Sequence, residues 1–169
     1  MRETKAHSNI IKIEINPMKT AQQWYDEYAV SHQNETNQKI HYICVPAIFF
    51  SIVGMIMSIP SGFIQNTLGI SNPMLGNWAS IVMVFLLIFY LRLSFTLFLR
   101  MLGFGVLTII GNYYLGQYLP LFITSLAIFV AAWIGQFYGH HIEGKKPSFI
   151  KDLQFLLIGP AWVLEKLSK

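Results

Sequence analysis

Long apolar runs alternate with short polar segments along most of the chain. Four such runs cover approximately residues 40–59, 78–91, 95–114 and 119–138. A helix needs about 20 apolar residues to cross roughly 30 Å of hydrocarbon, so each run is expected to form a transmembrane helix. The second run is the shortest, and it spans only if Asn77 and Arg92 lie at its two membrane interfaces.

Polar or interrupted segments flank these four runs. Residues 20–32 predict a short amphipathic helix at the membrane interface, with a capping box between Thr20 and Gln23. The last apolar stretch, residues 149–164, is broken by Gly159 and Pro160 and is expected to be interfacial or re-entrant. Residues 1–17 have no clear period and are expected to be a disordered or non-native extension. A single membrane domain then occupies residues 18–169.

Composition supports an all-α integral membrane protein. Hydrophobic residues make up 54% of the chain and charged residues 12%, about half of the roughly 25% that soluble domains carry. The net charge of +4 is not gathered into a basic stripe, which argues against nucleic-acid binding. A single cysteine, Cys44, excludes an intrachain disulfide.

The basic residues predict the orientation. With four spans, all twelve Lys and Arg residues fall on the side that carries both termini. The positive-inside rule makes this side cytoplasmic. The membrane is expected to be the inner membrane in a bacterium and the endoplasmic reticulum in a eukaryote. A homo-oligomer is compatible with the pattern.

Four of the five histidines gather at the cytoplasmic ends of the first and fourth predicted spans. They are His32, His41, His140 and His141. His32 and His41 are nine positions apart, and a straight helix would put them on opposite faces. They converge only if the chain bends between them. Residues 33–37 are expected to form this bend, with Asn37 capping the helix that follows.

The second histidine group lies at the end of the fourth span. Gln136, His140 and Glu143 are spaced by four and three, so they share one helical face, whereas His141 points away. Polar groups at such a position are functional candidates. Two histidines and a carboxylate form the usual site of non-haem Fe(II) oxygen chemistry. The candidate metal ligands are therefore His32, His41, His140 and Glu143.

Other interpretations of the histidines remain open at this point. They could be interfacial residues hydrogen-bonded to carbonyls and headgroups, in a non-enzymatic lipid-binding or scaffold protein. Membrane di-iron desaturases resemble one another in having about eight clustered histidines, and this chain has five. A haem protein of four helices would carry histidine pairs within its spans rather than at their ends.

Two motifs resemble those of one family. The first consists of Tyr28, His32, Asn37, His41 and Pro46, with Cys44 in place of a family glycine. The second consists of Trp133, Gln136, Phe137, Gly139, His140, Glu143 and Pro147. Gly159, Pro160 and Glu165 match a later motif. With these residues the chain resembles the small membrane proteins of the yeast-type 2-hydroxy fatty acid dioxygenase family, which acts in phytosphingosine breakdown.

The resemblance implies an Fe2+-dependent α-oxidation, in which a 2-hydroxy fatty acid and O2 give the fatty acid one carbon shorter and CO2. It implies that His32, His41 and His140 are metal ligands. Glu143 would be a further ligand or lie beside the metal in a catalytic role. Tyr28 and Asn37 would orient ligands through hydrogen bonds. Fold and motif do not fix the substrate, so another hydroxy acid is an open alternative.

Overall fold

The computed structural model describes residues 19–144 and 149–167, and these residues form seven helices and no strand. They are α1 (Ala21–Ala29), α2 (Glu35–Met57), α3 (Gly62–Leu68), α4 (Trp78–Leu93), α5 (Phe95–Tyr118), α6 (Leu121–Glu143) and α7 (Phe149–Leu167). The predicted all-α class is therefore confirmed for the described residues. The predicted extension, residues 1–17, lies outside them.

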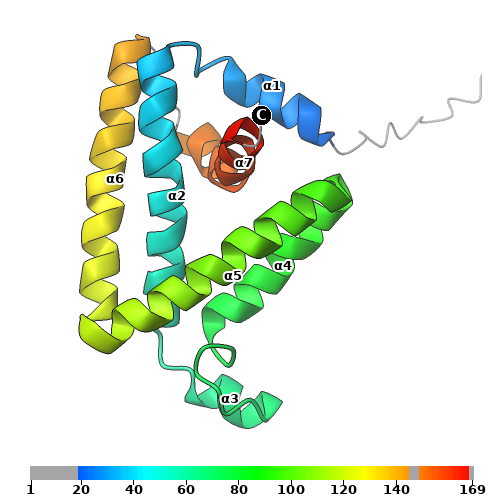
Figure 1. Ribbon diagram of the computed structural model, residues 1–169, viewed down its shortest axis with the longest axis vertical. Helices are drawn as coiled ribbons and strands as arrows, with labels where there is room; N and C mark the ends of the chain where they lie inside the picture. Colours follow the sequence, from blue (N-terminus) through cyan, green and yellow to red (C-terminus); the bar gives the residue numbers. More distant parts are fainter. Residues whose placement is uncertain (1–18, 145–148, 168–169) are drawn as a thin grey trace, which may run out of the picture.

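The helices form two antiparallel pairs (Figure 1). Helices α2 and α6 run side by side, and α4 and α5 form a second pair that crosses them obliquely. Helices α1 and α7 pack near the end of the molecule where α2 begins and α6 ends, while α3 lies near the opposite end. The described residues before α2 and after α6 thus meet at one end of the bundle.

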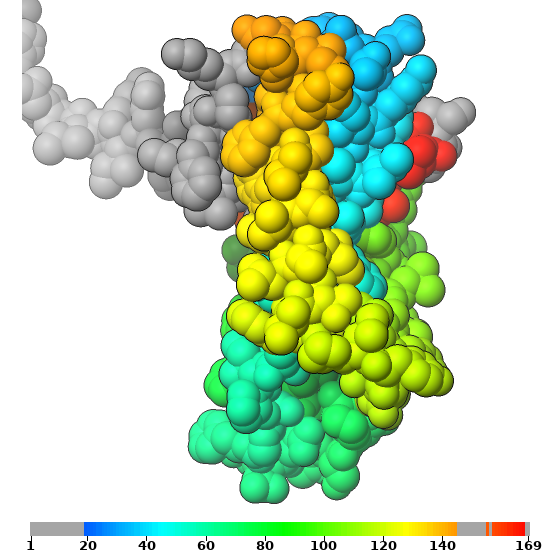
Figure 2. Space-filling model, turned by 90° about the vertical axis from the view of Figure 1, so that its left-hand side faces the viewer, coloured from blue at the N-terminus to red at the C-terminus, as the bar shows by residue number. Residues whose placement is uncertain are grey.

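Three helices, α2, α5 and α6, are long and apolar enough to cross a membrane, with 23, 24 and 23 residues. Helix α4 is also apolar but has 16 residues, which corresponds to about 24 Å. A total of four spans therefore stays a prediction. Helix α6 faces the viewer in Figure 2, and several of its large apolar side chains are exposed. They include Phe122, Ile123, Leu126, Val130 and Ile134. Such a surface suits contact with lipid rather than water.

The ends of α1 and α2 follow from local hydrogen bonds. The predicted capping box is confirmed, because Thr20 and Gln23 bond reciprocally at the start of α1. The chain then turns, as predicted, before α2. The prediction that Asn37 caps α2 was wrong, because the Asn34 side chain accepts from the backbone N–H groups of Thr36 and Asn37. Helix α2 therefore starts three residues earlier, and Asn37 becomes a buried residue of its first turn.

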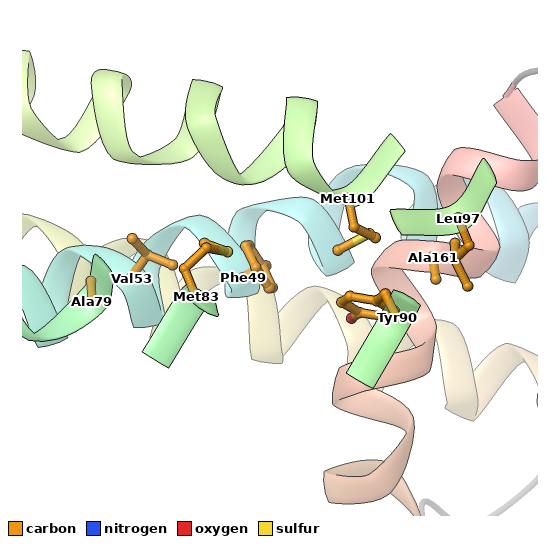
Figure 3. Packing of buried hydrophobic residues seen from close by; sticks show 8 residues of the cluster. All are labelled: Phe49, Val53, Ala79, Met83, Tyr90, Leu97, Met101 and Ala161. Carbon is orange, nitrogen blue, oxygen red and sulfur yellow. The ribbon is translucent and has the colours of Figure 1, made fainter. Parts of the chain in front are cut away.

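The largest apolar cluster joins four helices (Figure 3). It consists of Phe49, Val53, Ala79, Met83, Tyr90, Leu97, Met101 and Ala161. Ala161 brings α7 into the cluster beside residues of α2, α4 and α5. A second, smaller cluster of Tyr28, Val45, Trp162 and Val163 joins α7 to α1 and α2. Helix α7 is therefore part of the packed interior.

Polar contacts fix α7 against the α4–α5 pair. The Tyr90 hydroxyl donates to the Leu157 carbonyl oxygen at 2.5 Å, and Arg100 forms an ion pair with Glu165. Burial, together with the negative charge of Glu165, raises the pKa of Tyr25 in α1 to about 12. This phenol therefore stays neutral near pH 7. The Tyr90–Leu157 hydrogen bond and the Arg100–Glu165 ion pair hold α7 across the end of the bundle where the histidines lie.

Gly54 lies where α2, α5 and α6 pack closely against one another. A Cβ atom built on Gly54 would overlap both the Asn112 side-chain oxygen and the Ser125 hydroxyl. The Asn112 amide donates to the Phe50 carbonyl at 3.0 Å, so it cannot turn aside without losing this bond. Close approach of the three helices therefore depends on the absence of a side chain at position 54.

Replacing Gly54 with alanine is expected to destabilise the folded protein by about 1–3 kcal/mol, as overpacking of a dense interior usually does. The measurement is the unfolding midpoint in detergent. Gly103→Ala in α5 is the matched control, because nothing lies within 4 Å of the added methyl group. Alanine there should leave stability unchanged or raise it, since it favours helix more than glycine does. Equal unfolding midpoints for the two variants would contradict the close packing of the three helices at Gly54.

Candidate metal centre

Three histidines from distant parts of the chain meet at one end of the bundle. His32 comes from the turn after α1, His41 from the second turn of α2 and His140 from the last turn of α6. All three are buried, with 3%, 1% and 5% of their surface exposed. The potential ligand atoms of the three rings lie within 4.8 Å of one another. The side chains of His32, His41 and His140 therefore converge, as the sequence predicted.

Backbone contacts fix the protonation of two of these rings. Nδ1 of His32 lies 2.6 Å from the Tyr28 carbonyl oxygen, and Nδ1 of His41 lies 2.9 Å from the Asn37 carbonyl oxygen. A carbonyl oxygen only accepts hydrogen bonds, so both Nδ1 atoms must carry the proton. The neutral rings then have their lone pair on Nε2, which is the form that binds a metal. The second nitrogen of a metal-binding histidine is usually held in this way.

The three rings line a small cavity of about 20 Å³. Its other walls are formed by Tyr28, Val45, Trp133, Gln136 and Phe155. A volume of this size admits one ion or one water molecule. The Nε2 atom of His41 is buried and has no hydrogen-bond partner among the described residues. A buried nitrogen lone pair without a partner is costly in an apolar interior, and a bound cation would satisfy it.

Aromatic side chains hold His32 from two helices. The Tyr28 ring stacks on the imidazole with centroids 4.0 Å apart and an angle of 6° between the planes. Trp162 of α7 lies 5.8 Å from the same imidazole and 5.0 Å from the Tyr28 ring. Because Tyr28 and Trp162 are both buried, the His32 ring has little freedom to rotate away from the other two histidines.

Glu143 joins the three segments that carry the histidines. Its carboxylate accepts hydrogen bonds from the backbone N–H groups of Gln33 and Asn34 at 2.8 and 2.9 Å, and from the Asn37 side-chain amide at 3.0 Å. Asn37 in turn is the residue whose carbonyl contacts His41. Glu143 does not belong to the group of ligand atoms formed by the three histidines. In this structure its carboxylate links α6 to the α1–α2 turn and to Asn37 of α2, and its role as a metal ligand stays a prediction.

The glycine at position 139 lets α6 pack closely against Asn37, a hydrogen-bond partner of Glu143. A Cβ atom at Gly139 would overlap the side-chain oxygen of Asn37, and it would lie 3.5 Å from the His41 ring. One turn deeper, Cys44 packs against Gly135, where a Cβ atom would lie 2.6 Å from the sulfur. The Cys44 departure from the family motif is thus accommodated by helix packing and lies outside the walls of the histidine cavity.

The structure brings together most of the residues singled out from the sequence. His32, His41, His140, Tyr28 and Gln136 line one cavity. Asn37 and Glu143 are not among its lining residues but bond to each other. His141 is exposed, as its position on the helix predicts, and His7 lies outside the described residues. The contributions of Phe155 and Trp162 were missed, because no periodicity predicts that α7 packs against a site formed by the other helices.

Comparison with known families identifies the chain. A family model described as "2-hydroxy-palmitic acid dioxygenase Mpo1-like" matches residues 18–169. The chain belongs to this Mpo1-like family. The family description implies dioxygenase activity on a 2-hydroxy fatty acid. No curated protein and no solved structure matches the chain.

The donor atoms suit a metal of the kind that a dioxygenase in the Mpo1-like family would use. Imidazole nitrogen binds iron, zinc, copper and nickel well, and three neutral imidazoles leave further coordination positions for oxygen ligands. The lone pairs on Nε2 of His32 and His41 and the small cavity between the rings fit one such ion. Three histidines in this arrangement are compatible with iron.

Proposed function

We propose that this protein is an Fe2+-dependent dioxygenase that shortens 2-hydroxy fatty acids by one carbon. The overall reaction is R–CH(OH)–COOH + O2 → R–COOH + CO2 + H2O. The C1–C2 bond breaks, the carboxyl carbon leaves as CO2, and C2 becomes the carboxyl carbon of the product. The observation that supports this most strongly is the buried group of three histidines in a chain of the Mpo1-like family.

The proposed ligands are His32, His41 and His140. Bound Fe2+ would supply the electrons that activate O2, which amino-acid side chains cannot do at neutral pH. The Tyr28 and Asn37 carbonyls would keep Nδ1 of His32 and His41 protonated and so keep Nε2 available. Glu143 would act as a positioning residue through its bonds to Gln33, Asn34 and Asn37.

The cavity walls suggest how a 2-hydroxy fatty acid is oriented. The histidines and Gln136 supply polar groups to the lining, and Val45 and Phe155 supply apolar surface. The carboxylate and 2-hydroxyl would face the histidines, and the acyl chain would pass the apolar residues towards the bilayer. Because the cavity is about 20 Å³, entry of a substrate requires aromatic side chains to move apart. A closed wall would then exclude water during the reaction.

The proposed location is the membrane region near the cytoplasmic surface. Helices α1 and α7 and the ends of α2 and α6 that carry the histidines lie together (Figure 1). The positive-inside rule, applied to a topology of four spans, would put this end and both termini in the cytoplasm. The lipid bilayer would deliver the substrate, since a long acyl chain partitions into hydrocarbon by about 0.8 kcal/mol per CH₂.

Purified protein reconstituted with Fe2+ under anaerobic conditions tests the function. We expect close to one iron per chain. We also expect O2 consumption with 2-hydroxypalmitic acid, accompanied by equal amounts of CO2 and pentadecanoic acid. Palmitic acid, which lacks the 2-hydroxyl, is the control substrate and should give neither product. Protein that binds no metal and consumes no O2 would favour the alternative, a non-enzymatic lipid-binding or scaffold protein that uses the same polar end.

A further inference from the structure

Trp133 carries a buried polar group that the proposed function has not used. The residue is only half-buried in α6, yet its Nε1 atom is buried and has no hydrogen-bond partner among the described residues. The N–H edge of the indole therefore faces inward, while another part of the ring reaches the molecular surface. The side chain also lines the cavity between the histidines.

An indole N–H without an acceptor is unfavourable in this position. Buried tryptophan nitrogens usually have a hydrogen-bond partner. The apolar contacts do not require the nitrogen, because the ring packs between Phe129 and Phe137 of the same helix at 6.1 and 5.5 Å. The N–H is therefore suited to an acceptor brought by a ligand.

The cavity limits what this acceptor can be. Trp133 and the three histidines line the same cavity, so a polar head group that enters it beside a metal ion on the histidines lies against the indole as well. The indole nitrogen only donates, so it requires an oxygen that accepts. No Lys or Arg is among the residues that line the cavity. Apart from a metal ion on the histidines, the groups that can bind a carboxylate there are therefore neutral donors, and hydrogen bonds to an ionised acceptor are the stronger ones.

We propose that the Trp133 N–H donates a hydrogen bond to a carboxylate oxygen of the 2-hydroxy fatty acid. This inference rests on the proposed function and adds a residue that recognises the acid group of the substrate. The neighbouring amide of Gln136, which lines the same cavity, supplies a second neutral donor. The side chains that would select the acid beside the metal ion are thus uncharged and belong to α6, one and two turns before His140.

The test compares Trp133→Phe with Trp78→Phe in protein loaded with Zn2+, which occupies imidazole sites without oxygen chemistry. Trp78 is the matched control, because its Nε1 already donates to the Pro60 carbonyl at 3.1 Å and it lies outside the cavity. Binding of 2-hydroxypalmitic acid and of 1,2-hexadecanediol, which lacks the carboxylate, is measured by equilibrium titration. Indole N–H resonances of ¹⁵N-labelled tryptophan provide a second readout.

We expect Trp133→Phe to weaken binding of the acid by about tenfold or more, as loss of a hydrogen bond to a charged group does. Binding of the diol and of Zn2+ should be unchanged, and Trp78→Phe should bind the acid as the wild type does. In wild-type protein the acid should move one indole resonance downfield, and this resonance should be absent from Trp133→Phe.

Two results would overturn the proposal, and they are distinguishable. If Trp133→Phe binds the acid as tightly as the wild type does, and the acid shifts no indole resonance, Trp133 does not bind the substrate. The proposed function would then remain intact. Wild-type protein that binds Zn2+ but binds no 2-hydroxy acid would remove the proposed function, and the role of Trp133 with it.

Discussion

Replacing His41 with alanine is expected to abolish metal binding at this site and all turnover that depends on it. Nε2 of His41 is buried without a hydrogen-bond partner among the described residues, and its ring lies 4.3 and 5.0 Å from those of His32 and His140. Removing it leaves two imidazoles around an enlarged cavity. The affinity for Fe2+ should fall by more than the roughly 10–100-fold that loss of an outer hydrogen-bond partner costs. Elemental analysis and O2 uptake measure both losses.

The chain offers a matched control for this variant. His141 is adjacent to His140 in α6 but is exposed and does not line the cavity. His141→Ala should therefore keep the metal content and the turnover of the wild type. Retained activity in His41→Ala, or equal losses in the two variants, would be incompatible with a centre formed by His32, His41 and His140.

Glu143→Ala is expected to lower the affinity for Fe2+ by about 10–100-fold without removing the site. The variant loses the acceptor of three hydrogen bonds that hold the α1–α2 turn and Asn37 against α6. His32 and His41 would then be held less firmly, but their Nδ1 contacts to backbone carbonyls would remain. A titration with Fe2+ should reach the same stoichiometry at higher metal concentration.

The control for Glu143 is Glu35→Ala, which removes an exposed carboxylate from the first residue of α2. It should leave the affinity for Fe2+ unchanged. A different result for Glu143→Ala would support its predicted role as a ligand: the variant would then fail to reach one iron per chain at any concentration. Unaltered affinity would mean that the hydrogen bonds of Glu143 contribute nothing to the site.

The sequence was informative wherever spacing along one helix determines position. It predicted the long helices, because apolar runs of this length have few alternatives. It also predicted that His32 and His41 converge through a bend, since nine residues of straight helix would separate them. The exact start of α2 was beyond its reach, because Asn34 and Asn37 are both good capping residues and only the path of the turn selects Asn34.

Contacts between distant segments were less predictable. The helical face shared by Gln136, His140 and Glu143 indicated which residues lie together, but not that the Glu143 carboxylate bonds to backbone N–H groups at positions 33 and 34. Residues 149–164 were expected to be interfacial or re-entrant because Gly159 and Pro160 interrupt the apolar pattern, and their position relative to the membrane stays a prediction. In the structure α7 is a continuous helix with buried residues, since its packing against α1, α2 and α5 compensates for the proline.

The hydrogen bond between Gln33 and Glu143 links residues 110 positions apart, and this separation has a consequence for biosynthesis. A ribosome adds about 5–20 residues per second, so His32 and His41 are made several seconds before His140 completes the site. A nascent chain that ends before α6 lacks both the third imidazole and the Glu143 carboxylate. If the proposed site binds iron, its capture would be a late event, and bound iron would mark chains whose synthesis and helix assembly are finished.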